Sequence, residues 1–467
     1  MPQTNRHASA PPSAPGAQPP SSANLSSTPE EAGRTRAPEG KPGADPTRRA
    51  LYWLITLCGL AAGVGVTATQ MRLTDFPIDM IIYREGVQAF FSGREVYGEP
   101  MMAGDIALPF IYPPFGAVAL APLAPAAISH AIAGDVMIAI SGGLMLACLY
   151  VVLRAVIRER DRPWLLPLTA AAWPAAMSIE PVVLNDDFAQ INVVIMALVV
   201  FDLVPRKRVL PQGWLIGLAI AIKISPAAML LYFLIQRRLA PILVAAGSAL
   251  AATGLAAAIR WDQTKEFFLS VLVDMGSDSN FGVDSTYTSN SSLKGMVMRF
   301  SPTRDWLENN GLTVNIIWAV LALATILVGA WVMVRLIARG APTQAWLVNA
   351  LIMLLISPIS WSHHWVWLAL LFAVVGYRTF VWGAEKTQEK TAQPMWRHIP
   401  GTSWICAFWV ALVITLPPKW WFGDGVEFED LNFFATFLVS DFVWLALAFM
   451  AAVALRTRPS KTAIHIA

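Results

Sequence analysis

Apolar stretches of membrane-spanning length recur along the chain, and short polar stretches separate them. A helix rises about 1.5 Å per residue, so about 20 apolar residues cross the roughly 30 Å hydrocarbon layer of a bilayer. This pattern predicts an all-α integral membrane protein. The stretches cover residues 50–70, 131–156, 163–180, 188–204, 239–259, 313–338, 344–362, 364–380, 401–418 and 434–456.

One further apolar stretch, residues 209–236, is interrupted in its middle by Lys223 and Pro226. Basic clusters flank it at residues 206–208 and 237–238. Because basic loops tend to stay in the cytoplasm, we expect this stretch to enter the membrane and return as two half-helices that turn at Lys223. A broken helix at membrane depth is tolerated where it lines a cavity, so the turn is a candidate site.

The remaining charges sort onto two sides of the membrane. The acidic side holds the loops 71–112, 180–192 and 419–432, and the long loop 260–312 joins them. This alternation predicts about twelve segments with both termini in the cytoplasm, and the proline-rich residues 113–130 are expected to form a short re-entrant or interfacial piece. The basic groups of the other side are Arg48–Arg49, Arg154–Arg162, Arg206–Arg208, Arg237–Arg238, Arg335 with Arg339, Arg378–Arg397 and Arg456–Lys461.

An amphipathic helix is expected in the first loop on the acidic side. Pro77 suits a helix start because its φ is already helical, and Ser92-Gly93 would end the helix. Asp79 falls in the first turn, where it can satisfy the helix dipole or act as a general base, and Asp75 competes for that role. The apolar positions expected to lie on the membrane surface are Ile78, Ile81, Ile82, Val87, Phe90 and Phe91.

The amino-acid composition is that of a membrane protein, and it argues against nucleic-acid binding and against a cysteine metal site. Hydrophobic residues make up 56% of the 467-residue chain and charged residues 14%, with a mean hydropathy of +0.53. The net charge of +3 is too small to indicate nucleic-acid binding. The three cysteines show no metal-type spacing. Residues 1–47 are predicted to be a disordered cytoplasmic tail, residues 48–458 the transmembrane domain and residues 459–467 a second tail.

Two polar clusters on the acidic side contain imidazole, carboxylate and amide groups. His363 and His364 stand between tryptophans in Ser357–Trp365, where they can donate to a phosphate; a metal would need further ligands that the neighbouring sequence lacks. The tryptophans can equally form an interfacial belt. The stretch Asn185–Asn192 suits recognition of a polyhydroxyl compound, or Asp187 simply caps a helix.

Two cationic groups complete the set. Lys223 can compensate a lipid phosphate or extend to the interface. In Asn290–Arg299, Lys294 and Arg299 can bind a phosphate group or remain solvated loop charges. With Asp79, the clusters predict one cavity at the lipid–water boundary. The sequence has no GxGxxG turn and no Walker loop, so a lipid-linked phosphate is a better donor candidate than a sugar nucleotide.

Six stretches resemble one known family across residues 50 to about 385. They are IDMIIYREG, LPFIYPPFGAV, DDFAQINVVIMAL, GLAIAIKISPA, SNSSLKGMVMR and LLISPISWSHHWVWL. The sequence resembles the polyprenyl-phosphate-sugar-dependent glycosyltransferases of family 87, within the GT-C superfamily. It looks most like the actinobacterial mannosyltransferases that extend phosphatidylinositol mannosides and lipomannan; the last two spans add little.

The resemblance implies a GT-C fold and inverting transfer of mannose from polyprenyl-phosphate-mannose to a lipid-linked mannoside. The reaction would take place on the extracytoplasmic face of the plasma membrane, with no nucleotide or metal cofactor. Asp79 would be the general base, and the donor phosphate would be held by His363, His364, Lys223 and Arg299. Substrate-binding residues would be Tyr83, Tyr112, Asp187, Gln190, Asn192, Asn290 and Trp361.

The chain departs from the family pattern at two positions. Ala189 stands where the family commonly has glycine, and Ser291 stands where it commonly has glutamine; the second change bears on the acceptor. Two alternatives remain. An arabinofuranosyltransferase that uses decaprenyl-phosphoarabinose belongs to the same family. A secondary transporter would instead need internal repeats and ionisable groups at the midplane of the membrane.

Overall fold

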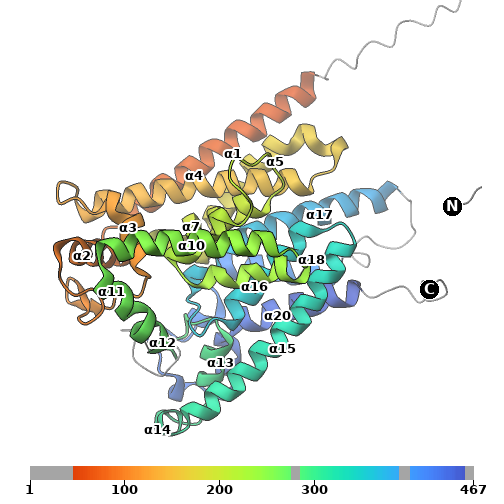
Figure 1. The fold of residues 1–467 in the computed structure, drawn as a ribbon. Coiled ribbons are helices and arrows are strands. Elements are labelled where there is room, and N and C mark those ends of the chain that lie inside the picture. Colours follow the sequence, from red (N-terminus) through yellow and green to blue (C-terminus); the bar gives the residue numbers. More distant parts are fainter. Residues whose placement is uncertain (1–45, 275–283, 389–399, 458–467) are drawn as a thin grey trace, which may run out of the picture. The chain divides into compact units, whose positions relative to one another are not determined.

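The computed structural model describes residues 46–274, 284–388 and 400–457, which form helices joined by short loops and one small hairpin (Figure 1). The chain divides into two compact units, Met1–Arg49 and Ala50–Ala467, and the second unit carries every predicted site residue. The predicted tails, residues 1–47 and 459–467, lie outside the described residues apart from Pro46 and Thr47, which begin the first helix.

The described residues contain six helices that are long and apolar enough to cross a membrane, or seven if a bent pair counts as one span. The bent pair joins α19 (Phe433–Val439) to α20 (Asp441–Arg456) at an angle of 69°. The six are α1 (Pro46–Leu73), α4 (His130–Val156), α10 (Leu239–Ile259), α15 (Gly311–Ala338), the segment Ser362–Val381 and the segment Gly401–Trp420.

The other expected segments are shorter than a full span. They form α5 (Leu165–Met177), α7 (Asn192–Leu203) and α16 (Pro342–Ile356). The helical, membrane-type fold class is therefore confirmed in its coarse form, and the count of twelve segments and the side of each terminus stay predictions.

Helix α16 lies at the centre of the second unit. Its residues from Ala345 to Leu355 are all buried, as expected of a helix that is apolar on every side. Helix α15 packs along it, and α20 and α17 (Leu368–Gln388) also contact it (Figure 1). A turn of 3-10 helix, η5 (Ser362–Trp367), joins α16 to α17.

Helix α2 (Ile78–Ser92) has the predicted bounds, because Pro77 precedes it and Gly93 ends it with a φ of 83°. Its environment differs from the prediction. Ile81, Ile82, Val87 and Phe90 are buried within the protein, and of the apolar positions expected on the membrane surface only Phe91 is largely exposed. Other parts of the protein cover this face in place of the bilayer, and the Phe110 ring packs directly against Gly86.

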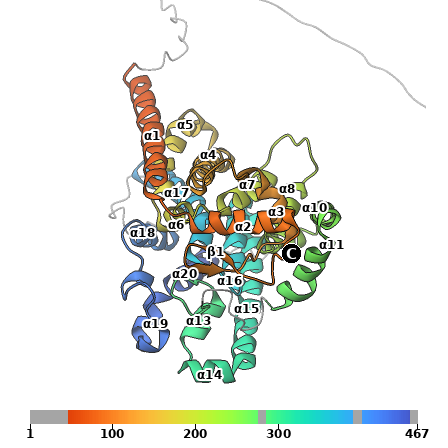
Figure 2. The same cartoon turned by 90° about the vertical axis from the view of Figure 1, so that its left-hand side faces the viewer.

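Short elements complete this end of the molecule, which Figure 2 views face on. Strands β1 (Met101–Ala103) and β2 (Ile106–Leu108) form an antiparallel hairpin. Helix α3 (Pro114–Leu120) and the 3-10 turn η1 (Ala121–Leu123) follow, in agreement with the short piece predicted for residues 113–130. The Arg84 guanidinium of α2 donates to the carbonyl oxygens of Leu123 and Ile128 at 2.6 and 2.7 Å and so fixes α2 against this piece.

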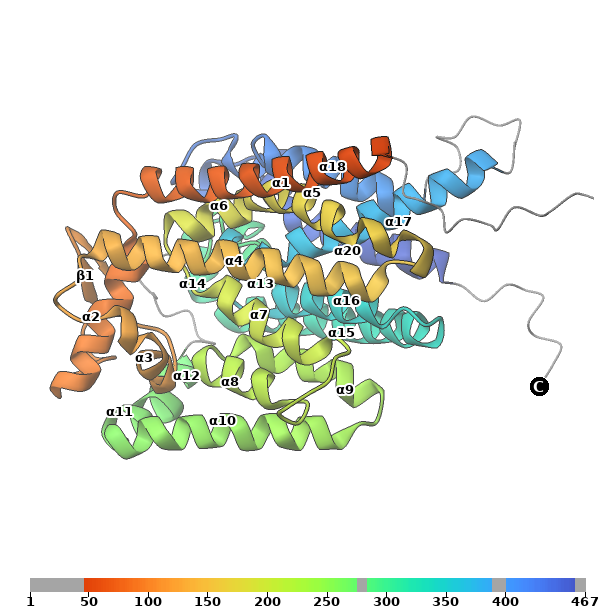
Figure 3. The ribbon, with the colours of Figure 1, turned by 90° about the horizontal axis from the view of Figure 1, so that it is seen from above.

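The interrupted stretch forms two helical halves that turn at Lys223, as predicted; its entry into the membrane stays a prediction. It forms α8 (Trp214–Ile222), a break at Lys223, the 3-10 helix η3 (Ser225–Leu230) and α9 (Leu231–Ile235). Gln212, before α8, accepts a hydrogen bond of 2.7 Å from Arg238, after α9. The two ends of the stretch are therefore adjacent, and Lys223 lies at the far turn, with α8 between α7 and α10 (Figure 3).

The remaining described elements connect these helices. They are η2 (Glu159–Trp164), α6 (Glu180–Asp187), α11 (Trp261–Glu266), the π-helical η4 (Phe267–Val271), α12 (Leu272–Asp274), α13 (Leu293–Arg299), α14 (Arg304–Asn309), α18 (Gly401–Ile414), η7 (Pro418–Trp420) and η8 (Phe428–Asp430).

Candidate active site

Five segments that are distant in sequence meet at one hydrogen-bonded cluster. They are the start of α2, the loop before α3, the turn between α6 and α7, the break after α8 and the start of η5. Because helices end or break at each of these points, polar side chains converge without interrupting a longer helix. We call this group the Asp79 cluster; it consists of Asp79, Tyr83, Tyr112, Gln190, Asn192, Lys223, His363 and His364.

Asp79 is half-buried in the first turn of α2, and its carboxylate is hydrogen-bonded to the Gln190 side chain. Desolvation by burial raises its pKa to about 6, although the Gln190 hydrogen bond and the charge of Lys223 act in the opposite direction. The carboxylate is therefore mostly ionised at neutral pH and can still accept a proton. Asp75, the competing candidate, is exposed at the loop before the helix.

Gln190 links the carboxylate to two phenols. The hydroxyls of Tyr83 and Tyr112 donate to its Oε1 at 2.5 and 3.2 Å, and the two hydroxyls lie 2.7 Å apart. Since both phenols approach the amide oxygen, the amide nitrogen is left to donate to Asp79. Burial also raises the pKa of Tyr83 and Tyr112, which keeps both phenols protonated.

The turn that presents Gln190 contains the first departure from the family pattern. Ala189 has a φ of 51°, in the left-handed region that glycine adopts without strain. A glycine, which the resemblance leads us to expect here, would adopt this backbone without strain, whereas the alanine of this chain is strained.

Lys223 supplies the positive charge of the cluster. Its Nζ lies 3.0 Å from Asn192 Oδ1 and 3.0 Å from His364 Nε2, and 5.3 Å from the centre of the Tyr112 ring. When the lysine is charged it donates to Nε2, so the proton of His364 is on Nδ1. Asn192 also donates to the carbonyl oxygen of His363 at 3.2 Å. This bond holds the turn that contains His363 and His364, which we call the histidine turn, beside the lysine.

His363 is buried, and neither of its ring nitrogens has a hydrogen-bond partner among the described residues. Its ring packs edge-on against Phe188 and His364, with centroids 5.2 and 4.8 Å apart. A buried imidazole without partners is costly, so this group is available to a substrate atom. No group of three His, Cys, Asp or Glu side chains in the described ranges lies close enough to hold a metal ion.

Arg299 and Asn290 lie apart from the Asp79 cluster, in a second buried network. Arg299 donates to the carbonyl oxygens of Tyr287 and Asn290 and to Ser440 Oγ, at 3.2, 2.9 and 3.0 Å. The Asn290 amide bonds to backbone groups, including the Ser360 nitrogen at 3.0 Å. The structure does not bring these two residues beside Lys223; their bonds hold together the loops before α13 and after α16.

Lys419 is the centre of this second network, which we call the Lys419 network. Its Nζ donates to Ser291 Oγ at 2.9 Å and to Ser362 Oγ at 3.1 Å, and lies 3.6 Å from Asp441 Oδ1. Ser362 in turn donates to Glu180 at 2.7 Å. Ser291, the second departure from the family pattern, is therefore buried against a lysine.

Sequence reasoning missed the role of Lys419. The available signal was that Glu180 and Lys419 are single charges at the ends of apolar stretches, and that Asp441 is a single charge within one. Two other predicted residues are peripheral: Asp187 is exposed at the end of α6, and Trp361 pairs by backbone with Asn290. The neighbouring Asp186 is fully buried, and burial raises its pKa to about 8.

A protein-family model and several known proteins match this chain in sequence. A family model described as glycosyltransferase family 87 matches residues 110–358. Two relatives are named polyprenol-phosphate-mannose-dependent alpha-(1-2)-phosphatidylinositol mannoside mannosyltransferase. That of Mycolicibacterium smegmatis is 31% identical over 83% of this chain and 93% of its own. That of Mycobacterium tuberculosis is 34% identical over 73% of this chain and 79% of its own.

One solved structure is similar over much of its length. It is ArnT from Cupriavidus metallidurans bound to undecaprenyl phosphate, with a TM-score of 0.42 and 13% sequence identity, over 87% of this chain and 78% of that chain. A likeness at this TM-score does not fix the fold.

Proposed function

The chain belongs to glycosyltransferase family 87, and we propose that it transfers mannose from polyprenyl-phosphate-mannose to a phosphatidylinositol-mannoside-type acceptor, forming an α-1,2 linkage. The names of its relatives support this donor and this class of acceptor. They favour mannose over arabinose, and an enzyme over a transporter.

The Asp79 carboxylate near Lys223, which in turn contacts His364, is the observation that carries the proposal. Asp79 takes the proton of the acceptor hydroxyl as that oxygen attacks the anomeric carbon of mannose. The bond between the anomeric carbon and the phosphate oxygen breaks with inversion, and its electron pair leaves with the polyprenyl phosphate. The pKa of about 6 at Asp79 suits a base that works near neutral pH.

Lys223 and the histidine turn hold the donor phosphate. The developing negative charge on the leaving phosphate oxygen is stabilised by the lysine charge and by imidazole N–H groups at fixed positions. His363 contributes ring nitrogens that have no partner among the described residues. We leave Arg299 out of this set, because its bonds to two backbone carbonyls and Ser440 support the loop before α13 instead.

The substrates are oriented around the base by Tyr83, Tyr112 and Asn192. They reach the base past Asp187 and Trp361. We further propose the GT-C arrangement, with about twelve segments in the plasma membrane and the Asp79 cluster facing away from the cytoplasm. The division of charge between the two ends of the helices supports this orientation.

Transfer of labelled mannose from mannosyl-phosphopolyprenol, in membranes that carry the protein, tests the proposal. We expect transfer by wild type, a loss of at least about a hundredfold in Asp79→Asn, and near wild-type transfer by Asp75→Asn, whose position is exposed. The variants are compared at equal abundance. Transfer of arabinose but not mannose would overturn the donor assignment, and full activity in Asp79→Asn would overturn the base.

A further inference from the structure

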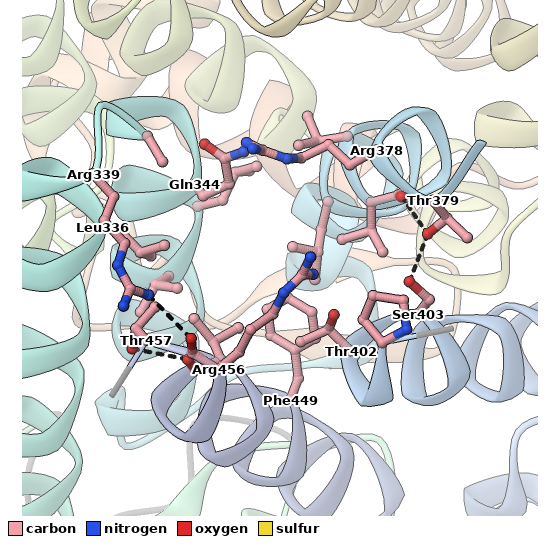
Figure 4. Close-up of a pocket in the computed structure, with 18 residues that line it drawn as sticks. Leu336, Arg339, Gln344, Arg378, Thr379, Thr402, Ser403, Phe449, Arg456 and Thr457 are labelled. Atoms are coloured by element: carbon pink, nitrogen blue, oxygen red, sulfur yellow. Dashed lines mark hydrogen bonds between the residues drawn. The ribbon is translucent and has the colours of Figure 1, made fainter. Parts of the chain in front are cut away.

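A second candidate site lies at the opposite end of α16 from the histidine turn. A cavity of about 240 Å³ opens where α15 and α20 end and where α16 and α18 begin, beside the first half of α17 (Figure 4). The cavity lining reaches Val348 of α16, and about 12 Å of helix separates that residue from Ile356, at the end that leads to His363. The cavity shares no lining residue with the Asp79 cluster.

Three arginines line the cavity, and no acidic residue is among its lining residues. Arg456 and Arg378 are close enough to repel each other, and Arg339 and Arg456 also repel. The Arg456 guanidinium points toward the middle of the cavity in Figure 4 and has no acidic partner in the part of the chain that the structure describes. All three arginine residues are exposed to solvent, and their combined positive charge attracts an anion to the cavity.

Neutral polar groups lie beside these charges. Gln344, with its amide oriented to satisfy its hydrogen bonds, accepts from Arg378. Thr379, which follows Arg378 on α17, and Ser403 of α18 place their hydroxyls 2.6 Å apart in the cavity wall, and the Thr379 hydroxyl donates to the carbonyl oxygen of Val375 (Figure 4). A phosphate oxygen in the cavity would therefore find guanidinium donors, with hydroxyl groups beside them.

The floor of the cavity is apolar. Leu347, Val374 and Phe449 are among the residues that form it, and they come from three different helices. A ligand that fits the whole cavity thus has a negatively charged head and an apolar body. A free phosphate ion would use only the arginines and would leave the floor empty.

We propose that this cavity binds the phosphate headgroup of an anionic phospholipid, with the start of an acyl chain on its apolar floor. Basic pockets between membrane helices bind such headgroups, and each arginine near an anionic membrane surface strengthens binding about fivefold. The predicted topology puts this end of the helices on the cytoplasmic side, where the basic loops gather.

Thermal unfolding of the full chain in detergent, titrated with phosphatidylglycerol, phosphatidylcholine or inorganic phosphate, tests the proposal. A ligand of the folded state raises the unfolding midpoint as its concentration increases. We expect phosphatidylglycerol to stabilise wild type more than phosphatidylcholine does, and Arg378→Gln/Arg456→Gln to bind it about thirtyfold more weakly. A matched control, Arg206→Gln/Lys207→Gln, removes the same charge from an exposed loop and should keep wild-type affinity.

Arg378→Lys/Arg456→Lys shows whether a loss reflects charge or misfolding, since it should recover part of the affinity while unfolding at the wild-type midpoint without lipid. Equal stabilisation by inorganic phosphate would replace the lipid with a free anion. Equal lipid affinity in wild type and the glutamine variant, or equal losses in that variant and the control, would overturn the site.

Discussion

The pKa of Asp79 makes the proposed reaction sensitive to acid in a defined way. Transfer requires the ionised carboxylate, and burial raises its pKa from 3.8 to about 6. The ionised fraction is then about nine-tenths at pH 7 and about one-tenth at pH 5. We expect the rate at low donor concentration to be at its plateau above this pKa and to fall about tenfold between pH 7 and pH 5.

The substitution Gln190→Leu tests whether this pH dependence comes from the Asp79 carboxylate. The Gln190 side chain is hydrogen-bonded to Asp79 and is the largest influence that lowers its pKa. A hydrogen bond to a charged group contributes about 1.5–3 kcal/mol, which corresponds to about one to two pH units. The acid limb of the variant should therefore lie about one to two units higher than that of wild type.

The assay measures transfer of labelled mannose in membranes at a series of pH values on both sides of pH 6. Asp75→Asn serves as the matched control and should keep the wild-type midpoint, because its exposed carboxylate lies outside the cluster. The reasoning fails if Gln190→Leu, at equal abundance, has the same acid limb as wild type, or if wild type shows no acid limb above pH 5.

Three further outcomes are expected. Lys223→Met should lower transfer about a hundredfold or more at equal abundance, and Lys223→Arg should recover part of it, because a charge that faces the leaving phosphate is lost and then restored. Ala189→Gly should raise the free energy of unfolding by up to about 1 kcal/mol, since the backbone there is left-handed; a lower unfolding midpoint would contradict this. Lys419→Met should cost about 3 kcal/mol in stability by removing the ion-pair partner of the buried Asp441, and adding Asp441→Leu should restore most of it in thermal unfolding.

The sequence was sufficient to predict where a helix begins, ends or turns when a few characteristic residues, such as a proline or a glycine, mark the position. Pro77 and Gly93 determine the bounds of α2, and basic residues at both ends of one apolar stretch predicted the turn at Lys223. The environment of α2 could not be derived in the same way. An amphipathic pattern shows that a face is buried, but a membrane surface and a groove in the protein bury the same side chains.

The side of the membrane on which a residue lies does not determine which residues are its neighbours. Charge distribution placed Lys223 and Arg299 on one predicted side, and both were expected to contact the donor phosphate. The structure brings only Lys223 to His364, while Arg299 bonds to Ser440. Neighbours within a layer depend on helix packing, which the distribution of charge along one chain does not specify.

The C-terminal helices, which add little to the resemblance in sequence, support the histidine turn. Lys419 follows α18, beyond the residues matched by the family model, and donates to Ser362. Ser362 directly precedes His363, so the Lys419 network fixes one end of η5 while Asn192 holds the carbonyl oxygen of His363. The imidazoles are thus held from two sides, and a fixed position of this kind is what stabilisation of a leaving phosphate requires.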